Sequence, residues 1–194
     1  MLIVRHRVNS KTELAFVPTT MGVEIDLRSR NDQIILEHDP FKAGELFEDW
    51  LASWDQQLLV LNIKEEGLEE RVLEILKKFG ISNYFFLDQS FPFMQKLIRQ
   101  GNTRVAARAS DLESVETPLE SGASWCWLDS FSGNWEYLST VVPRLNAAKI
   151  STCLVSPELQ RADSDSELLR LQGIIQRDGL RIDAVCTKKP ERWL

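Results

Sequence analysis

The sequence predicts an α/β protein, a small (β/α)8 barrel of the TIM type with parallel strands and short crossovers. Eight apolar, strand-like runs recur along the chain, and segments with helical periodicity lie between them. Strands that alternate with helices in this way form parallel sheets through right-handed crossovers. The chain of 194 residues contains no linker and no low-complexity segment, so we expect a single domain over residues 1–194.

The eight runs are short and apolar, and most of them end on polar or charged residues. They cover residues 2–6, 23–28, 58–64, 84–88, 104–108, 124–129, 150–155 and 182–187. Eight strands with intervening helices is the count of a TIM barrel, which usually needs roughly 200 to 400 residues. Because this chain is shorter, we expect short loops and some degenerate helices.

Helical periodicity is clearest in four segments. Residues 66–80 place apolar side chains on one face and end at Gly80, a typical C-terminal cap. The others are residues 41–53, residues 91–100, and a long helix that begins at Asp163 or Ser164 and ends at Gly179. Pro143 should kink or shorten a helix over 135–148, and only weak helices are expected over 9–20 and 111–121.

The alternative fold is an open, doubly wound sheet, which the same alternation also permits. The glycine-rich phosphate loops GxGxxG and GxxxxGK[ST] are both absent from the sequence. Their absence makes a nucleotide-binding version of that fold less favoured than the barrel.

Charge and cysteine content limit the classes of function. The net charge is −6, which argues against a general nucleic-acid binder because such a protein needs a basic face. Cys126, Cys153 and Cys186 each lie in an apolar run, as buried free thiols of a cytosolic protein do. No apolar run approaches the roughly 20 residues of a membrane span or has the form of a signal peptide. We therefore expect a cytoplasmic protein.

Chemistry-bearing residues gather at the ends of the predicted strands, where TIM barrels place their active sites. His6 and Arg7 end the first run, and the only other histidine, His38, follows an apolar run that begins after the turn at residues 31–32. Glu24 and Asp26 are two residues apart on a strand and so share one face. The remaining strand-end residues are Arg28, Asn62, Lys64, Asp88, Arg108 and Asp129. Solvated strand ends explain each charge singly, but not why both histidines are in the set.

The same residues carry a family resemblance. His-Arg at 6–7, GVEIDLR at 22–28, His-Asp at 38–39, NIK at 62–64 and Ser-Phe at 90–91 resemble the glycerophosphodiester phosphodiesterases. AVCTKKPERW at 184–193 is similar to the family's closing strand. The wider group includes the phosphatidylinositol-specific phospholipases C and the sphingomyelinase-D-like toxins. The resemblance runs in register over nearly the whole chain, and its specific part is residues 6–64.

The resemblance implies a role for each matched residue. His6 and His38 would be the acid–base pair, and Glu24 and Asp26 would hold a divalent cation, Mg²⁺ or Ca²⁺. Asn62 stands where the family has a third acidic metal ligand. Arg7 and Lys64 would contact the substrate phosphate. Arg28, at the end of its strand, is a further candidate for substrate binding.

The sequence departs from the family at three places. Val8 replaces the usual glycine after His-Arg, and Asn62 removes one negative charge from the cation site. The segment after His38 is too short for the insertion that shapes the glycerol pocket in many relatives. This third departure concerns the substrate more than the chemistry.

We therefore expect a cation-assisted phosphodiester hydrolase that acts on a small phosphodiester or phosphorylated glycan. Two alternatives stay open. One is a cyclising lyase that uses a hydroxyl of the substrate as nucleophile, as phospholipases C do. The other is a catalytically silent barrel that binds a phosphorylated ligand or a partner protein. The sequence leaves the alcohols of the phosphodiester and the oligomeric state open.

Overall fold

The structure, a computed structural model, describes residues 1–162 and 164–194 in two compact units. The N-terminal unit comprises residues 4–100, and the C-terminal unit comprises residues 1–3 and 101–194. Asp163, one of the two predicted start points of the last long helix, lies outside the described residues. The prediction of one domain over residues 1–194 stays a prediction.

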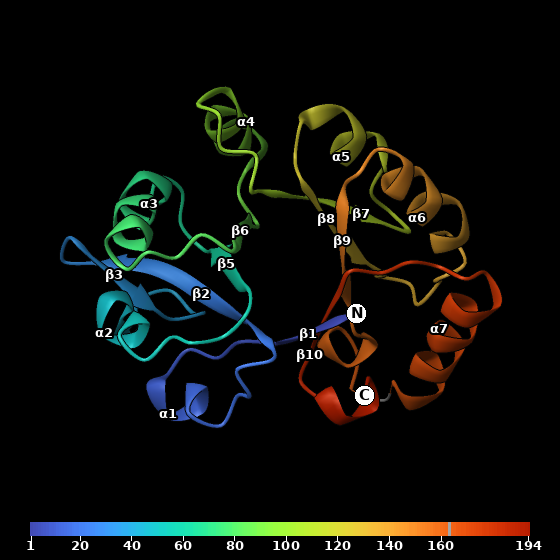
Figure 1. The fold of residues 1–194 in the computed structure, drawn as a ribbon, viewed down its shortest axis with the longest axis horizontal. Helices are drawn as coiled ribbons and strands as arrows, with labels where there is room; N and C mark the ends of the chain where they lie inside the picture. Colours follow the sequence, from blue (N-terminus) through green and yellow to red (C-terminus); the bar gives the residue numbers. More distant parts are fainter. Residues whose placement is uncertain (163) are drawn as a thin grey trace. The chain divides into compact units, whose positions relative to one another are not determined.

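The N-terminal unit is built on parallel strands that pair in chain order. They are β1 (Leu2–Arg5), β2 (Gly22–Arg30), β5 (Leu59–Ile63) and β6 (Tyr84–Leu87). Helices α1 (Lys11–Leu14), α2 (Phe47–Leu51), α3 (Glu69–Lys78) and α4 (Phe91–Arg99) follow these strands in turn (Figure 1). In this register Asp26 lies opposite Asn62, and Asn62 lies opposite Leu87.

An antiparallel hairpin extends this sheet beyond the predicted strands. After β2, Asn31 and Asp32 both adopt positive φ, +50° and +61°, and the chain returns as β3 (Gln33–Leu36). Such left-handed pairs form the tight turns of hairpins, and Asn and Asp tolerate them. A short strand β4 (Glu45–Leu46) then pairs with β3. The sequence indicated the turn but not these two strands.

The helix predicted over 41–53 is correspondingly shorter and begins only at Phe47. Gly44 explains the difference, because a Cβ at this position would lie 2.1 Å from the carbonyl oxygen of Leu36. The backbone therefore passes so close to β3 that only glycine fits. Residues 41–46 therefore form no helix, and Glu45 and Leu46 pair with β3 as strand β4 instead.

The C-terminal unit repeats the parallel arrangement. Its strands β7 (Ala106–Ser110), β8 (Trp125–Asp129), β9 (Ser151–Val155) and β10 (Ala184–Thr187) also pair in chain order. They alternate with α5 (Glu116–Ser121), α6 (Leu138–Ala147) and α7 (Asp165–Arg177), and short 3-10 turns cover Pro157–Leu159 and Pro190–Arg192. Pro143 lies inside α6, which begins at Leu138 instead of near 135.

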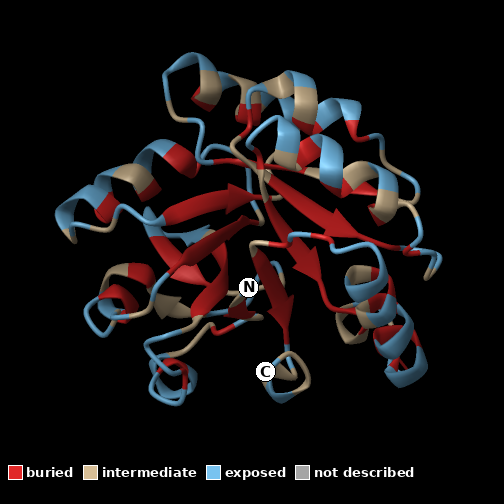
Figure 2. Cartoon of the chain, turned by 45° about the vertical axis from the view of Figure 1, so that its right-hand side comes forward, coloured by how far each residue is buried: buried red, intermediate tan, exposed pale blue. Residues whose placement is uncertain are grey.

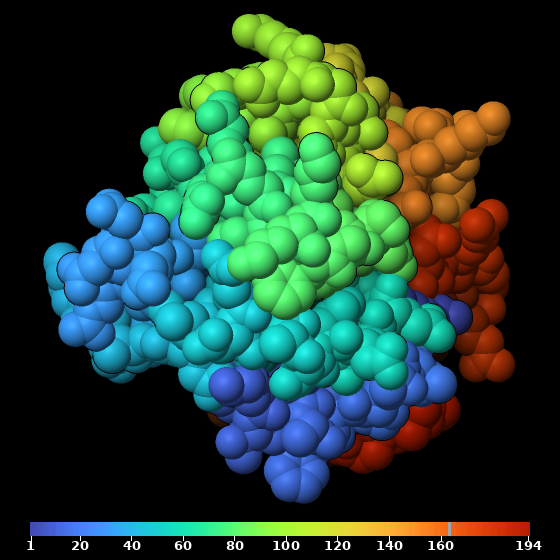
Figure 3. Space-filling view, turned by 60° about the vertical axis from the view of Figure 1, so that its left-hand side comes forward, coloured from blue at the N-terminus to red at the C-terminus, as the bar shows by residue number. Residues whose placement is uncertain are grey.

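The strands form the core of both units. Figure 2 shows the strands as almost uniformly buried, whereas each helix is buried along one side and exposed along the other. Cys126, Cys153 and Cys186 are buried free thiols, as predicted. Figure 3 shows the surface of the N-terminal unit, coloured from blue to green. In this unit Glu48 of α2 pairs with Lys78 of α3 at 2.5 Å. Among the described residues no helix has the length and apolarity needed to traverse a bilayer.

Candidate functional site

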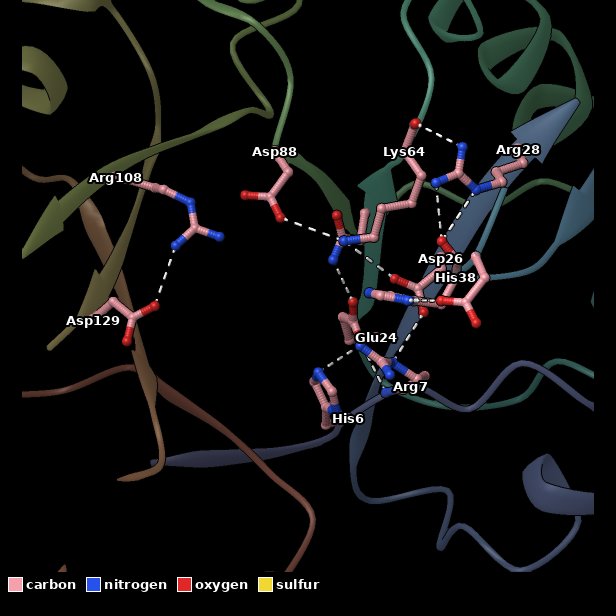
Figure 4. Close-up of polar contacts among 12 residues, drawn as sticks. His6, Arg7, Glu24, Asp26, Arg28, His38, Lys64, Asp88, Arg108 and Asp129 are labelled. Atoms are coloured by element: carbon pink, nitrogen blue, oxygen red, sulfur yellow. Dashed lines mark hydrogen bonds and ion pairs between the residues drawn. The ribbon is translucent and has the colours of Figure 1, made fainter. Parts of the chain in front are cut away.

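The carboxyl ends of β1, β2, β5 and β6 bring together most of the residues singled out in the sequence (Figure 4). They are His6, Arg7, Glu24, Asp26, Asn62, Lys64 and Asp88, all within the N-terminal unit. Two of these residues have a left-handed backbone, Arg7 with φ 53° and Asp88 with φ 60°. Backbone strain in residues other than glycine concentrates at functional sites, where the surrounding structure enforces it.

Glu24 lies at the centre of this group and is 1% exposed. Its Oε1 accepts a hydrogen bond of 2.8 Å from Nδ2 of Asn62, and its Oε2 accepts one of 2.7 Å from the backbone N–H of Arg7. The left-handed turn at Arg7 directs this N–H toward the carboxylate. His6 Nε2 lies 3.8 Å from the same Oε2.

Asp26 is fully buried and points to the same side as Glu24, as the strand alternation predicts. Asn9 holds it by two hydrogen bonds, from Nδ2 to Asp26 Oδ2 at 2.8 Å and from the Asp26 N–H to Asn9 Oδ1 at 2.9 Å. Arg7 Nε lies 3.4 Å from Oδ2, and Lys64 Nζ lies 3.4 Å from Oδ1. Lys64 also pairs with Asp88 at 3.7 Å.

The protonation of Glu24 depends on its burial and on the neighbouring carboxylate of Asp26. Burial, followed by the negative charge of Asp26, raises the pKa of Glu24 to about 7. The hydrogen bonds from Asn62 and from the Arg7 N–H, and the charge of Lys64, act in the opposite direction. Without a further positive charge, Glu24 is therefore partly protonated near neutral pH.

The donor set fits a hard divalent cation. In the described part of the chain, Asn62 Oδ1 and Asp26 Oδ1 are buried oxygen atoms without a hydrogen-bond partner, although Lys64 Nζ approaches Asp26 Oδ1 to 3.4 Å. Buried acceptors of this kind are costly unless a donor or a cation satisfies them. Carboxylate and amide oxygens are the ligands that Mg²⁺ and Ca²⁺ prefer. No group of three or more His, Cys, Asp or Glu residues suited to a metal occurs in the described chain, in keeping with the neutral Asn62 as the third residue.

His38 lies on the segment after β3, which is attached to β2 through a hydrogen bond from the Glu37 N–H to the Asp26 carbonyl, at 3.1 Å. The Nδ1 of His38 is 2.8 Å from Asp39 Oδ1, and Lys42 Nζ is 2.6 Å from Asp39 Oδ2. The hydrogen bond from Lys42, and then the one from His38, lowers the pKa of Asp39 to about 2. A carboxylate that is always charged thus fixes the orientation of this imidazole.

Sequence reasoning missed the roles of Asn9 and Asp39. In the sequence Asp39 is only the second residue of the His-Asp motif. Its position directly after His38 is the one sequence feature that could have indicated its contact with that ring. Asn9 is a common polar residue three positions after His6, and no pattern marked it. Arg28 was predicted to contact substrate, but in the described chain its hydrogen bonds all reach backbone carbonyls, those of His38 and Lys64.

Arg108 and Asp129, the other strand-end charges, form a separate cluster in the C-terminal unit. Arg108 Nη1 lies 3.2 Å from Asp129 Oδ2, and Gln160 Nε2 donates to the same oxygen at 2.8 Å. Burial raises the pKa of Asp129, against the influence of Arg108 and of these hydrogen bonds. This cluster stabilises the ends of β7 and β8 within its own unit.

Comparison with solved structures finds close likeness of fold. A glycerophosphodiester phosphodiesterase from Thermotoga maritima matches with a TM-score of 0.71 and 18% identity, over 99% of this chain and 96% of the other. One from Parabacteroides distasonis matches with a TM-score of 0.71 and 14% identity, over 98% of this chain and 93% of the other. No protein-family model and no curated protein matches the sequence. The likeness establishes that the chain has the (β/α)8 fold of these enzymes, as predicted.

Proposed function

We propose that this protein is a phosphoric diester hydrolase that uses His6 and His38 as an acid–base pair. The observation that carries the proposal is the grouping of His6 with two buried carboxylates, Arg7 and Lys64 at the carboxyl ends of the first strands. His38 lies on the segment that the Glu37 N–H attaches to the same strand β2. The fold of the glycerophosphodiester phosphodiesterases supports it, because TIM-barrel enzymes place their chemistry at this end of the strands.

The phosphate would bind through positive charge. Arg7 and Lys64 each lie 3.4 Å from an oxygen of Asp26, so both cations are next to the buried carboxylates. Each has further N–H groups that can donate hydrogen bonds to a bound anion. A divalent cation, Mg²⁺ or Ca²⁺, would be held by Glu24, Asp26 and Asn62. When bound, it would neutralise the carboxylates and the charge that develops on the phosphate oxygens.

The two imidazoles would move the protons. One takes a proton from the attacking water, and the other gives a proton to the leaving alkoxide. Asp39 holds the Nδ1 of His38, so Nε2 is the nitrogen of that ring that would transfer the proton. Glu24 Oε2 lies 3.8 Å from Nε2 of His6, so this carboxylate can orient that ring.

The other sequence predictions accompany this proposal. The substrate is a small phosphodiester or a phosphorylated glycan and not a nucleic acid, and the protein acts as a single domain in the cytoplasm. The runner-up reaction is cyclisation, in which a hydroxyl of the substrate replaces water as the nucleophile. The arrangement of the histidines serves both reactions equally.

The test is a phosphorus NMR screen of phosphodiesters with the whole protein, with and without added Mg²⁺ or Ca²⁺. A phosphomonoester product that forms with the cation supports the hydrolase. A cyclic phosphodiester product identifies the lyase instead. No turnover of any phosphodiester, with phosphorylated compounds bound unchanged, identifies a silent binding protein.

A further inference from the structure

Unlike Arg7 and Lys64, Arg28 makes no ion pair with a carboxylate in the described chain. Asp26 nevertheless lies two residues before Arg28 on β2. Its guanidinium forms a fork of three hydrogen bonds to backbone. Nε and Nη2 donate to the carbonyl of His38 at 3.1 Å and 3.0 Å, and Nη1 donates to the carbonyl of Lys64 at 3.1 Å (Figure 4). Arg28 thus bonds to the backbones of an acid–base residue and of a phosphate-binding residue.

The two carbonyls belong to segments that are each attached to β2. Lys64 continues the β2–β5 ladder through its N–H, which donates to the Leu27 carbonyl at 3.1 Å. His38 follows the hairpin, and the Glu37 N–H holds that segment at the Asp26 carbonyl. Beyond these residues both segments leave the sheet, so their backbone carbonyls need hydrogen-bond donors from outside the sheet. The planar guanidinium satisfies both at once.

We infer that Arg28 is a positioning residue, which fixes the loop that carries His38 to the end of β5 that carries Lys64. This role differs from the substrate binding that the sequence analysis expected of Arg28. This role requires the planar, forked guanidinium and not merely a positive charge, because three N–H donors reach two backbone carbonyls. The inference rests on the proposed function for its catalytic consequence, but its structural part stands without it.

The experiment compares Arg28→Lys and Arg28→Met in the full chain, with Arg30→Lys and Arg30→Met as controls. Arg30 is exposed and two residues further along β2, so it shares the strand face without the fork. Turnover is measured with bis(p-nitrophenyl) phosphate, the affinity for inorganic phosphate by calorimetry, and the mobility of the loop by amide hydrogen exchange at Glu37 and Asp39.

If Arg28 positions the loop, lysine should fail nearly as badly as methionine. Both variants should lose about 100-fold in kcat, because a small misplacement of a catalytic group costs about that much. The phosphate affinity should change by less than about threefold, since no phosphate contact is lost. The amides of Glu37 and Asp39 should exchange faster, and the Arg30 variants should resemble the wild type in every measurement.

Three results would overturn the inference. Arg28→Lys with normal kcat would show that charge suffices. A large loss of phosphate affinity in Arg28→Met, kept in Arg28→Lys, would make Arg28 a substrate contact. Unchanged exchange at Glu37 and Asp39 would show that the loop does not depend on it. If the wild type hydrolyses no diester, the proposed function fails, but exchange and phosphate binding still decide the role of Arg28.

Discussion

Asn62 donates its amide N–H to Glu24 at 2.8 Å, while its own Oδ1 is buried and has no hydrogen-bond partner among the described residues. A carboxylate at this position could not make that hydrogen bond. The neutral side chain therefore does two things: it stabilises the buried charge of Glu24 without a metal, and it keeps one oxygen available as a ligand. This pair is where the chain differs most clearly from the acidic metal site of the family it resembles.

Asn62→Asp should tighten cation binding and destabilise the cation-free protein. The change removes the hydrogen bond to Glu24 and adds a third buried carboxylate, which repels the other two until a cation neutralises them. Calorimetric titration of Mg²⁺, Ca²⁺ and Mn²⁺ into chelator-treated protein measures the first effect, and thermal unfolding with and without cation measures the second. Equal affinity in both proteins would contradict a cation at this position.

Glu24→Gln should make the cation-free protein more stable above neutral pH. The pKa of Glu24 is about 7 in the folded protein and 4.5 without the fold, so the folded state holds its proton more tightly. The resulting stabilisation is complete below pH 4.5 and is lost as the pH rises through 7. Glutamine does not titrate and removes this loss. Denaturant unfolding between pH 5 and 9 in chelator measures the effect, and parallel curves for the two proteins would refute it.

His6→Ala and His38→Ala should each lower turnover by about 10²- to 10⁴-fold, the usual contribution of a general acid or base. Neither should lower the melting temperature much, because neither ring is part of the buried core. Turnover on the diester found by the phosphorus NMR screen is the measurement. Full activity of both variants would exclude the acid–base pair, and unfolding of both would make the histidines structural.

Asp39→Asn should lower kcat at least tenfold while it preserves the fold, because a neutral amide holds Nδ1 of His38 less strongly than a carboxylate does. Lys42→Met is the matched control, since Lys42 bonds the other oxygen of Asp39. It should raise the pKa of Asp39 from about 2 and leave kcat near that of the wild type. The two pH–rate profiles distinguish these effects, and equal losses in both variants would assign Asp39 to loop structure alone.

Gly44→Ala should destabilise the protein by roughly 2 to 4 kcal/mol, because the new Cβ collides with the backbone of Leu36 and nothing flexible can move away. Gly173→Ala is the control. A Cβ at Gly173 meets nothing within 4 Å in helix α7, so alanine should stabilise by about 0.5 to 1 kcal/mol. Denaturant midpoints report both changes.

The strands were predictable because their signal is local. All eight predicted runs overlap a strand, and the alternation along β2 was sufficient to place Glu24 and Asp26 on one face. Strand β7 is shifted by two residues from the predicted 104–108, because its pairing with β8 begins at Ala106. The alternation of side chains within one run does not indicate where that strand begins to pair with its neighbour.

The rest of the site depends on contacts between distant segments. Asn9 reaches Asp26 only because the chain turns left-handed at Arg7, and Arg28 reaches His38 only because of the hairpin. Strand β4 and the shortened α2 follow from the approach of Gly44 to Leu36. None of these approaches has a periodic signature, so the sequence alone could name Asp26, Arg28 and His38 but not their partners.

The β2–β3 hairpin also limits how this chain can vary in length. Arg30 pairs with Gln33 and Leu27 pairs with Leu36, so the hairpin register fixes the interval between Asp26 and His38. Inserting one residue into either arm would turn the side chains of that arm to the opposite face. Adding one residue to each arm would lengthen the ribbon outward and leave the imidazole in place. Natural variants of this segment should therefore gain or lose residues in symmetric pairs about Asn31 and Asp32.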